Sequence, residues 1–285
     1  VGYQSLYSST TADDNVALGY LAGYNTTTGE SNVFIGGRSW DSGYGAGYNN
    51  TTGNYNIAIG SSTLGNNTTA SNNTTIGHQS LYSNTTGDGS AAFGFRALYT
   101  NTTGAYNAAS GTEALYSNTT GSYNVAQGRH ALYSNTTASG NTAIGYLAAY
   151  GNQTSGGLVA VGERALQAVT SGYENTAVGS LAGQNITTGI GNTTVGRESM
   201  MSLTTGSQNA AVGKLAMRNT STGNNNAALG QEAMRLNSSG GNNVAVGFES
   251  LYSNTSASNN TAVGYQAGYS NTAFNNSFFG YKAGY

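Results

Sequence analysis

One glycine recurs at a fixed step along nearly the whole chain, and this step constrains the fold more than any other feature. From Gly60 to Gly264 the glycine falls every 17 residues, and the intervals outside that stretch are 17, 17, 24 and 16 residues. A period this short is below that of most helical repeats and close to one coil of a β-solenoid. The sequence therefore predicts an all-β chain, a parallel β-solenoid or β-roll of about 17 coils with about 17 residues each, in which residues 1–285 form a single repeat array.

The low charge of the chain does not indicate disorder. Charged residues make up 7% of the sequence, about a quarter of the usual share. The apolar residues nevertheless keep their register from repeat to repeat, which a disordered chain has no reason to do. The net charge is -2 and the nine Lys and Arg residues are scattered, so no face is expected to bind nucleic acid. No apolar run is long enough for a membrane-spanning helix, and no membrane insertion is expected.

The repeat unit has the general form N-x-A-[VIL]-G-x-x-A-L-Y-x-N-T-T-G-x-x, numbered here from Asn as position 1. Positions 2 to 4 alternate as a short strand, so we expect side chains 2 and 4 to fill the coil interior and Ala at position 3 to point outward. A second short strand is expected later in each coil, and the charged residues that gather at positions 6 and 7 predict a solvated edge. The glycine at position 5 is expected to adopt a positive φ or to let stacked backbones pass closely; examples are Gly60, Gly77, Gly94, Gly145, Gly162 and Gly179.

Apolar side chains left outside such narrow coils predict an oligomer. Ala at position 3 and the Leu-Tyr pair at positions 9 and 10 would form apolar stripes, which a partner normally covers. Identical copies packed side by side would cover them, and a parallel homotrimer is the expected closed solution. The alternative is a monomeric solenoid wide enough to use both stripes internally. The expected oligomer seam consists of Leu98, Tyr99, Leu115, Tyr116, Leu132 and Tyr133.

Both ends of the sequence lie inside a repeat. It begins with Val1-Gly2 and finishes with Ala283-Gly284-Tyr285, without an atypical capping unit at either end. Because solenoids normally need caps, we expect that terminal caps or flanking domains are absent from this segment of a longer protein. A subunit whose ends stack on its neighbours in a filament is the alternative.

The stretches Asn56 to Gly60 (N-I-A-I-G) and Asn243 to Gly247 (N-V-A-V-G) carry a family resemblance. They are similar to the N-S-V-A-I-G motif in the head repeats of trimeric autotransporter adhesins, which builds a left-handed parallel β-roll trimer. The longer stretches Asn260 to Tyr269 and Ala131 to Thr137 resemble repeat arrays of bacteriophage tail-fibre proteins and related bacterial surface proteins. The resemblance covers almost the whole chain. Adhesin head repeats are shorter than these, so the extra residues in the Asn-Thr-Thr turn could change how copies pack.

The resemblance implies a structural role without catalysis. It implies the shaft of a phage tail fibre on the virion surface, which spaces and presents a tip that binds a host cell-surface glycan or protein through flanking regions. The alternative is a bacterial or archaeal adhesin or extracellular filament at the cell surface. That alternative could be glycosylated at Asn-x-Thr sequons, among them Asn84, Asn101, Asn118 and Asn135. The third hypothesis is an ice-binding solenoid, because Thr at positions 13 and 14 would form a ladder, although Gln153 interrupts it.

Little in the sequence supports chemistry. The two histidines, His78 and His130, occupy positions expected to be exposed, there is no cysteine, and no nucleophile elbow, P-loop or dinucleotide fingerprint occurs. We therefore expect no enzyme, no metal site and no cofactor.

One repeat differs from the rest. The stretch from Asn32 to Tyr55 has seven additional residues and the only tryptophan. Insertions in solenoids often bind partners, and Trp with Tyr suits stacking on sugar rings. Trp40, Tyr44 and Tyr48 are therefore candidates for a glycan or receptor contact, the alternative being a loop whose Trp simply covers the solenoid.

Overall fold

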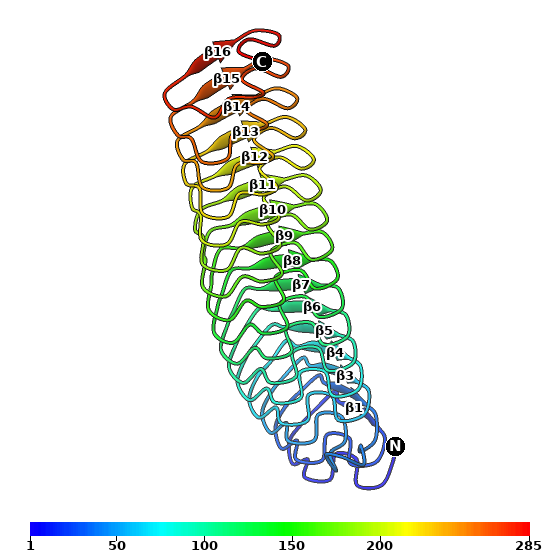
Figure 1. Cartoon of the computed structure of the whole chain (residues 1–285). Coiled ribbons are helices and arrows are strands. Elements are labelled where there is room, and N and C mark those ends of the chain that lie inside the picture. The colour runs from blue at the N-terminus through cyan, green and yellow to red at the C-terminus, as the bar shows by residue number, and fades with distance from the viewer. The chain divides into compact units, whose positions relative to one another are not determined.

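The structure, a computed structural model of residues 1–285, contains sixteen strands of three residues each and no helix. The sequence predicts one array, and the chain divides into two compact units of the same coils, Val1–Asn141 and Thr142–Tyr285. Within each unit every strand pairs in parallel with the strand of the next coil, and the arrows lie one above the next (Figure 1). The predicted all-β parallel solenoid with coils of about 17 residues is confirmed.

The strands follow the glycine step. The first unit contains β1 (Val16–Leu18), β2 (Val33–Ile35), β3 (Ile57–Ile59), β4 (Thr74–Ile76), β5 (Ala91–Phe93), β6 (Ala108–Ser110) and β7 (Val125–Gln127). The second unit contains β8 (Thr142–Ile144), β9 (Val159–Val161), β10 (Thr176–Val178), β11 (Thr193–Val195), β12 (Ala210–Val212), β13 (Ala227–Leu229), β14 (Val244–Val246), β15 (Thr261–Val263) and β16 (Ser277–Phe279).

The register between strands equals the glycine interval. Ala108 of β6 pairs with Val125 of β7, one 17-residue period later. Across the longer repeat, Val33 of β2 pairs with Ile57 of β3, so the extra residues loop out and leave the register unchanged. Equivalent positions of successive coils therefore stack directly on one another.

The prediction that side chains 2 and 4 of each strand point into the coil and side chain 3 points outward is wrong. In every strand from β1 to β15 the middle residue, at position 3, is the buried one. In β7, Ala126 is 1% exposed and Val125 is 40% exposed. The residues at positions 2 and 4 face outward. The interior already holds the leucine of position 9, such as the fully buried Leu98, so a methyl group is the usual side chain that fits beside it.

Two phenylalanines at position 3, the fully buried Phe34 and the partly buried Phe278, show how narrow this interior is. Phe34 occupies position 3, and its own coil and the preceding coil have glycine in place of leucine at position 9. A Cβ atom would lie 2.4 Å from the Phe34 ring on Gly47 and 2.7 Å from it on Gly23. Phe278 is flanked by Gly268 and Gly284 in the same way. In these coils the glycine at position 9 therefore makes room for the ring at position 3.

The second strand expected in each coil is absent. Positions 7 and 9 have a left-handed backbone, with φ of 52° at Arg96 and 55° at Leu98, which no strand adopts. Their amides still bond along the solenoid, since Arg96 donates to the carbonyl of His78 and Leu98 to that of Ala114, both at 3.0 Å. A left-handed leucine costs about 1–2 kcal/mol. Complete burial of its side chain stabilises the fold by about 1.5–3 kcal/mol, which offsets the cost of the strained backbone.

Two ladders of asparagines form hydrogen bonds between neighbouring coils in the interior of the first unit. At position 12, Nδ2 of Asn101 donates to Oδ1 of Asn84 (2.9 Å) and to the carbonyl oxygen of Gly104 (2.8 Å), and Nδ2 of Asn118 donates to Oδ1 of Asn101 (2.7 Å). At position 1, the side chain of Asn107 accepts the backbone N–H of Asn124 (3.0 Å). Buried amides must find partners, and each asparagine finds one in the neighbouring coil.

The second unit keeps one of these ladders and replaces part of the other. The position 1 row is bonded from Asn175 to Asn276, with backbone N–H groups donating to the amide oxygen one coil earlier. Position 12 changes to a buried apolar block of Val169, Ile186 and Leu203. Position 12 therefore accepts either hydrogen-bonded amides or aliphatic side chains, as long as successive coils have the same kind of side chain there.

The glycines at position 5 are required for two reasons at once. The six named above have φ between +132° and +139°. A Cβ on any of them would lie 2.4 to 2.7 Å from backbone atoms of the glycine one coil later. Both the positive φ and the close passage anticipated from the sequence are present.

A pair of glycine substitutions separates these two effects. We expect Gly94→Ala to destabilise the chain by more than about 3 kcal/mol, because it adds a backbone clash to an unfavourable φ. Gly140→Ala should cost about 1–2 kcal/mol, since its φ is +72° but nothing lies within 4 Å of its Cβ. Chemical denaturation followed by circular dichroism measures both, and equal losses would show that the close passage is unimportant.

Candidate interaction sites

The outward side chains at positions 2 and 4, called here the strand face, form an exposed and largely apolar surface, in which Thr, Ser and Gln also occur. In the first unit they include Val16, Leu18, Ile57, Ile76, Phe93 and Val125, each between 38% and 52% exposed. In the second unit they include Ile144, Val178, Val212, Leu229, Val244, Val263 and Phe279, each between 36% and 68% exposed. Contiguous apolar surfaces of this kind are uncommon on soluble monomers and mark interaction sites.

The strand face of the first unit is hollowed at its smallest side chains. Ala108 and Ser110 of β6 lie in a depression of about 220 Å³, with Phe93 of β5 and Val125 and Gln127 of β7 around it. A neighbouring surface that fits this face could place a side chain there.

The residues expected to form the oligomer seam separate into two groups. Leu98, Leu115 and Leu132 are fully buried inside their own coils, so they are not available to a neighbouring chain. This corrects the leucine half of the seam, and the physical reason is that the narrow interior needs these side chains for its core. The tyrosines are half-exposed and remain at the surface.

The tyrosines of position 10 form a stacked ladder. Tyr82, Tyr99, Tyr116 and Tyr133 follow one another with ring centroids 5.2 to 5.4 Å apart and nearly parallel planes. Tyr7, Tyr24 and Tyr48 form a similar stack at 5.2 and 5.3 Å. Aromatic pairs of this kind contribute about 0.5–1.5 kcal/mol each beyond their burial.

Tyr44 of the insertion joins the two stacks. The coil between them has Gly65 at position 10, so its own rung is missing. The Tyr44 ring lies 4.7 Å from Tyr48 and 6.1 Å from Tyr82 and occupies the gap. Gly65 is the sequence signal that could have revealed this role, because it is where the tyrosine pattern fails.

Enclosure in the ladder changes the ionisation of Tyr82. Burial first, and then the neighbouring Tyr44 and Tyr99, raise the pKa of Tyr82 from its ordinary value of 10.0. The unfolded chain therefore releases this proton at a lower pH than the folded chain. The contribution of Tyr82 to stability is present below pH 10.0 and decreases as the pH rises above that value.

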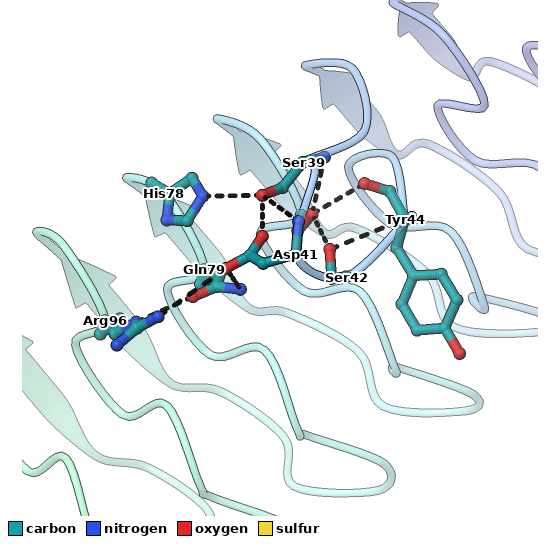
Figure 2. A network of polar contacts seen from close by, with 8 residues as sticks. Ser39, Asp41, Ser42, Tyr44, His78, Gln79 and Arg96 are labelled. Atoms are coloured by element: carbon teal, nitrogen blue, oxygen red, sulfur yellow. Dashed lines mark hydrogen bonds and ion pairs between the residues drawn. The ribbon is translucent and has the colours of Figure 1, made fainter.

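A polar network fixes the insertion to the following coils (Figure 2). Gln79 donates to Oδ2 of Asp41 at 2.9 Å, Arg96 lies 3.8 Å from the same oxygen, and Nε of Arg96 donates to Oε1 of Gln79 at 2.8 Å. Further along the insertion, the hydroxyl of Ser62 lies 2.5 Å from that of Ser42 and donates to the carbonyl of Tyr44 at 2.8 Å. The loop is thereby attached to three successive coils.

This network does not have the geometry of a catalytic triad. The Ser39 hydroxyl contacts both Nε2 of His78, at 3.2 Å, and the carboxylate of Asp41. The carboxylate is bonded to the serine and not to Nδ1 of His78, so it does not orient the histidine as a base. The other histidine, His130, lies 2.9 Å from the Glu113 carboxylate. No three His, Asp or Glu side chains gather where they could hold a metal ion.

The three aromatic residues singled out in the insertion do not lie together. Tyr44 and Tyr48 belong to the ladder, whereas the Trp40 side chain is 100% exposed. The guanidinium of Arg38 lies 6.0 Å from the Trp40 ring and 5.1 Å from the Tyr20 ring. Trp40 therefore does not cover the solenoid.

The four sequon asparagines named from the sequence lie in the interior. Asn84, Asn101, Asn118 and Asn135 are 0% exposed, and their amides form the position 12 ladder. A glycan on any of these amides is incompatible with this fold. The sequon pattern could not reveal that these asparagines are buried, because asparagine normally lies at the surface.

No family model matches the chain, and neither a curated protein nor a solved structure matches it. The structure has no helix with the length and hydropathy needed to span a membrane.

Two substitutions in the insertion should have opposite outcomes. Tyr44→Ala removes a rung that touches two rings, and we expect a loss of about 1–3 kcal/mol in the free energy of unfolding. Trp40→Ala removes a fully exposed ring and should change stability by less than about 0.5 kcal/mol. Thermal unfolding with hydrogen exchange of residues 56–89 measures both effects, and a neutral Tyr44→Ala variant would contradict the ladder role.

Proposed function

We propose that this protein is a structural shaft that assembles side by side as a parallel homotrimer through its strand face. The observation that carries the proposal is the row of exposed Val, Ile, Leu and Phe side chains at positions 2 and 4. These side chains are already about half-buried, so covering the rest contributes about half of the roughly 1.5–3 kcal/mol of complete burial, and each coil adds further side chains to the contact. Affinity would therefore grow with the number of coils.

A threefold axis suits this surface. Copies related by a threefold axis that runs parallel to the stacking direction of the coils all turn the same face toward that axis. Their coils stack in the same direction, and three copies close the assembly. The hollow at Ala108 and Ser110 offers space for a side chain of a neighbouring copy.

The repetition supports a spacing role. Within each unit each strand pairs with the strand of the next coil, and each coil adds a rise of about 4.8 Å along the stack. Together with the resemblance of the repeats to tail-fibre arrays, this supports a phage tail-fibre shaft on the virion surface, which presents a tip that binds a host receptor. The rival role as a cell-surface adhesin or filament loses the support of its four named sequons, because those asparagines are buried.

The assembly can be tested with charges on the strand face. We expect the unmodified chain to sediment as a trimer at micromolar concentration and the double variant Ile76→Lys with Phe93→Lys to sediment as a folded monomer. Lysines on this face would meet like charges across the threefold axis. The matched control is Tyr106→Lys with Tyr123→Lys, two exposed residues outside the strand face, which should stay trimeric. A monomeric unmodified chain would disprove the trimer.

The spacing role can be tested by changing the length. Deleting residues 90–140 removes three coils and joins position 17 to position 1 in register. We expect fibres about 14 Å shorter that still bind their receptor, since three coils rise about 4.8 Å each. Electron microscopy measures the length, and antibodies to the chain show whether it lies on virions or on cells. Loss of receptor binding by assembled short fibres would contradict a pure spacer.

A further inference from the structure

A trough lined only by Ser, Thr and Asn crosses five coils of the first unit. It runs between the position 11 row, from Ser8 to Ser83, and the position 13 row, from Thr27 to Thr85, and has a volume of about 570 Å³. None of its lining residues belongs to the strand face, so the proposed assembly leaves it free. In the next coil the hydroxyl of Thr100 folds onto the carbonyl oxygens of Tyr116 and Asn118, where the trough would otherwise continue.

The backbone of the trough has no strand edge to offer. The N–H of Asn49 donates to the carbonyl of Gly65 at 3.1 Å, and that of Thr51 donates to the carbonyl of Thr68 at 2.9 Å. Because these groups are used between coils, a peptide could not add to them as a further strand.

The position 11 row supplies hydrogen-bond donors. Nδ2 of Asn25 donates to Oδ1 of Asn49 at 2.9 Å, and Nδ2 of Asn49 donates to Oδ1 of Asn66 at 3.1 Å. An amide nitrogen carries two N–H groups, so Asn25 and Asn49 each keep one for a ligand after these bonds. The relay also fixes the orientation of the amides in advance.

The position 13 row supplies acceptors. The hydroxyls of Thr27, Thr51 and Thr68 each donate to the carbonyl oxygen at position 13 of the next coil, at 2.9 to 3.1 Å. A hydroxyl that has donated its hydrogen keeps lone pairs for an incoming donor. The trough therefore presents a row of oriented donors opposite a row of oriented acceptors, repeated once per coil.

The lining selects against charged ligands. It consists only of Ser, Thr and Asn, without a single Lys, Arg, His, Asp or Glu. The repeat of about 4.8 Å per coil is comparable to the length of one pyranose residue in an extended glycan. Sugar hydroxyl groups, which both donate and accept hydrogen bonds, match such a lining.

We propose that this trough binds an extended, uncharged oligosaccharide, with about one sugar residue per coil. Asn25 and Asn49 donate to sugar oxygens, and Thr51 and Thr68 accept from sugar hydroxyls. The site lies on the body of the array and is distinct from the receptor-binding tip expected in flanking regions.

The proposal is tested by titrating the chain with linear hexasaccharides. Cellohexaose and chitohexaose are the uncharged probes, a hyaluronan hexasaccharide is the charged one, and calorimetry and NMR shift mapping are the readouts. We expect at least one uncharged probe to bind and to shift the amides around Asn49 and Thr68, and the charged probe not to bind. Absence of binding by both uncharged probes at millimolar concentration would overturn the proposal, as would equal binding of the charged one.

Matched variants place the ligand in the trough. Thr68→Lys and Asn66→Leu alter the lining, and the second unit already holds the large side chains Gln153 and Leu236 at the same two positions. Each should weaken binding by about tenfold or more, while Thr119→Lys and Ser117→Leu, which introduce the same residues at the same two positions beyond the trough, should not. Equal affinities in folded variants of both sets would refute the site. These variants leave the strand face intact, so they should still sediment as trimers. Sedimentation therefore distinguishes a failure of the glycan proposal from a failure of the proposed trimer.

Discussion

The hydrogen bonding of each coil's backbone to the next, in unchanged register, is the constraint on which the rest of the structure depends. Since equivalent residues of successive coils stack directly, the side chain at each position must be able to pack against the side chain at the same position in the next coil. Amides bond to amides at position 12 of the first unit, and rings stack on rings at position 10. The glycines at position 5 follow from the same constraint, because a Cβ there would meet the next coil's backbone. Identical spacing thus converts a sequence period into continuous ladders.

The narrowness of the coil decides what reaches the surface. With leucine inside at position 9, the strand can turn only a small side chain inward, so its larger aliphatic residues face out. In the coils around Phe34 and Phe278, glycine at position 9 compensates for the larger ring. An apolar outer face is therefore a by-product of coil size, and assembly through that face is the simplest way to cover it.

The period, the parallel all-β architecture and the role of glycine could be predicted, because each depends on spacing alone. The orientation of the strand could not, since Ala and Val are both apolar and hydrophobicity does not distinguish the two faces. The pairing of Phe34 with Gly23 and Gly47 was the available signal, but it becomes visible only when positions 3 and 9 are known to face each other. The burial of the sequon asparagines and the place of Tyr44 in the ladder likewise depend on contacts between coils, which no single repeat contains.

The compensation around Phe34 also limits how such an array can change its length. Recombination between similar repeats can duplicate or remove a coil only where the new neighbours fit one another. Neighbouring coils that have Ala at position 3, Leu at position 9, Tyr at position 10 and Asn at position 12, such as those of β5, β6 and β7, meet this condition and are interchangeable. A crossover that separated Phe34 from either glycine, or Gly65 from the insertion that supplies Tyr44, would leave an overfilled core or a missing rung. Growth by duplication is therefore permitted in the uniform stretches, while the coils around the insertion must be inherited as a block.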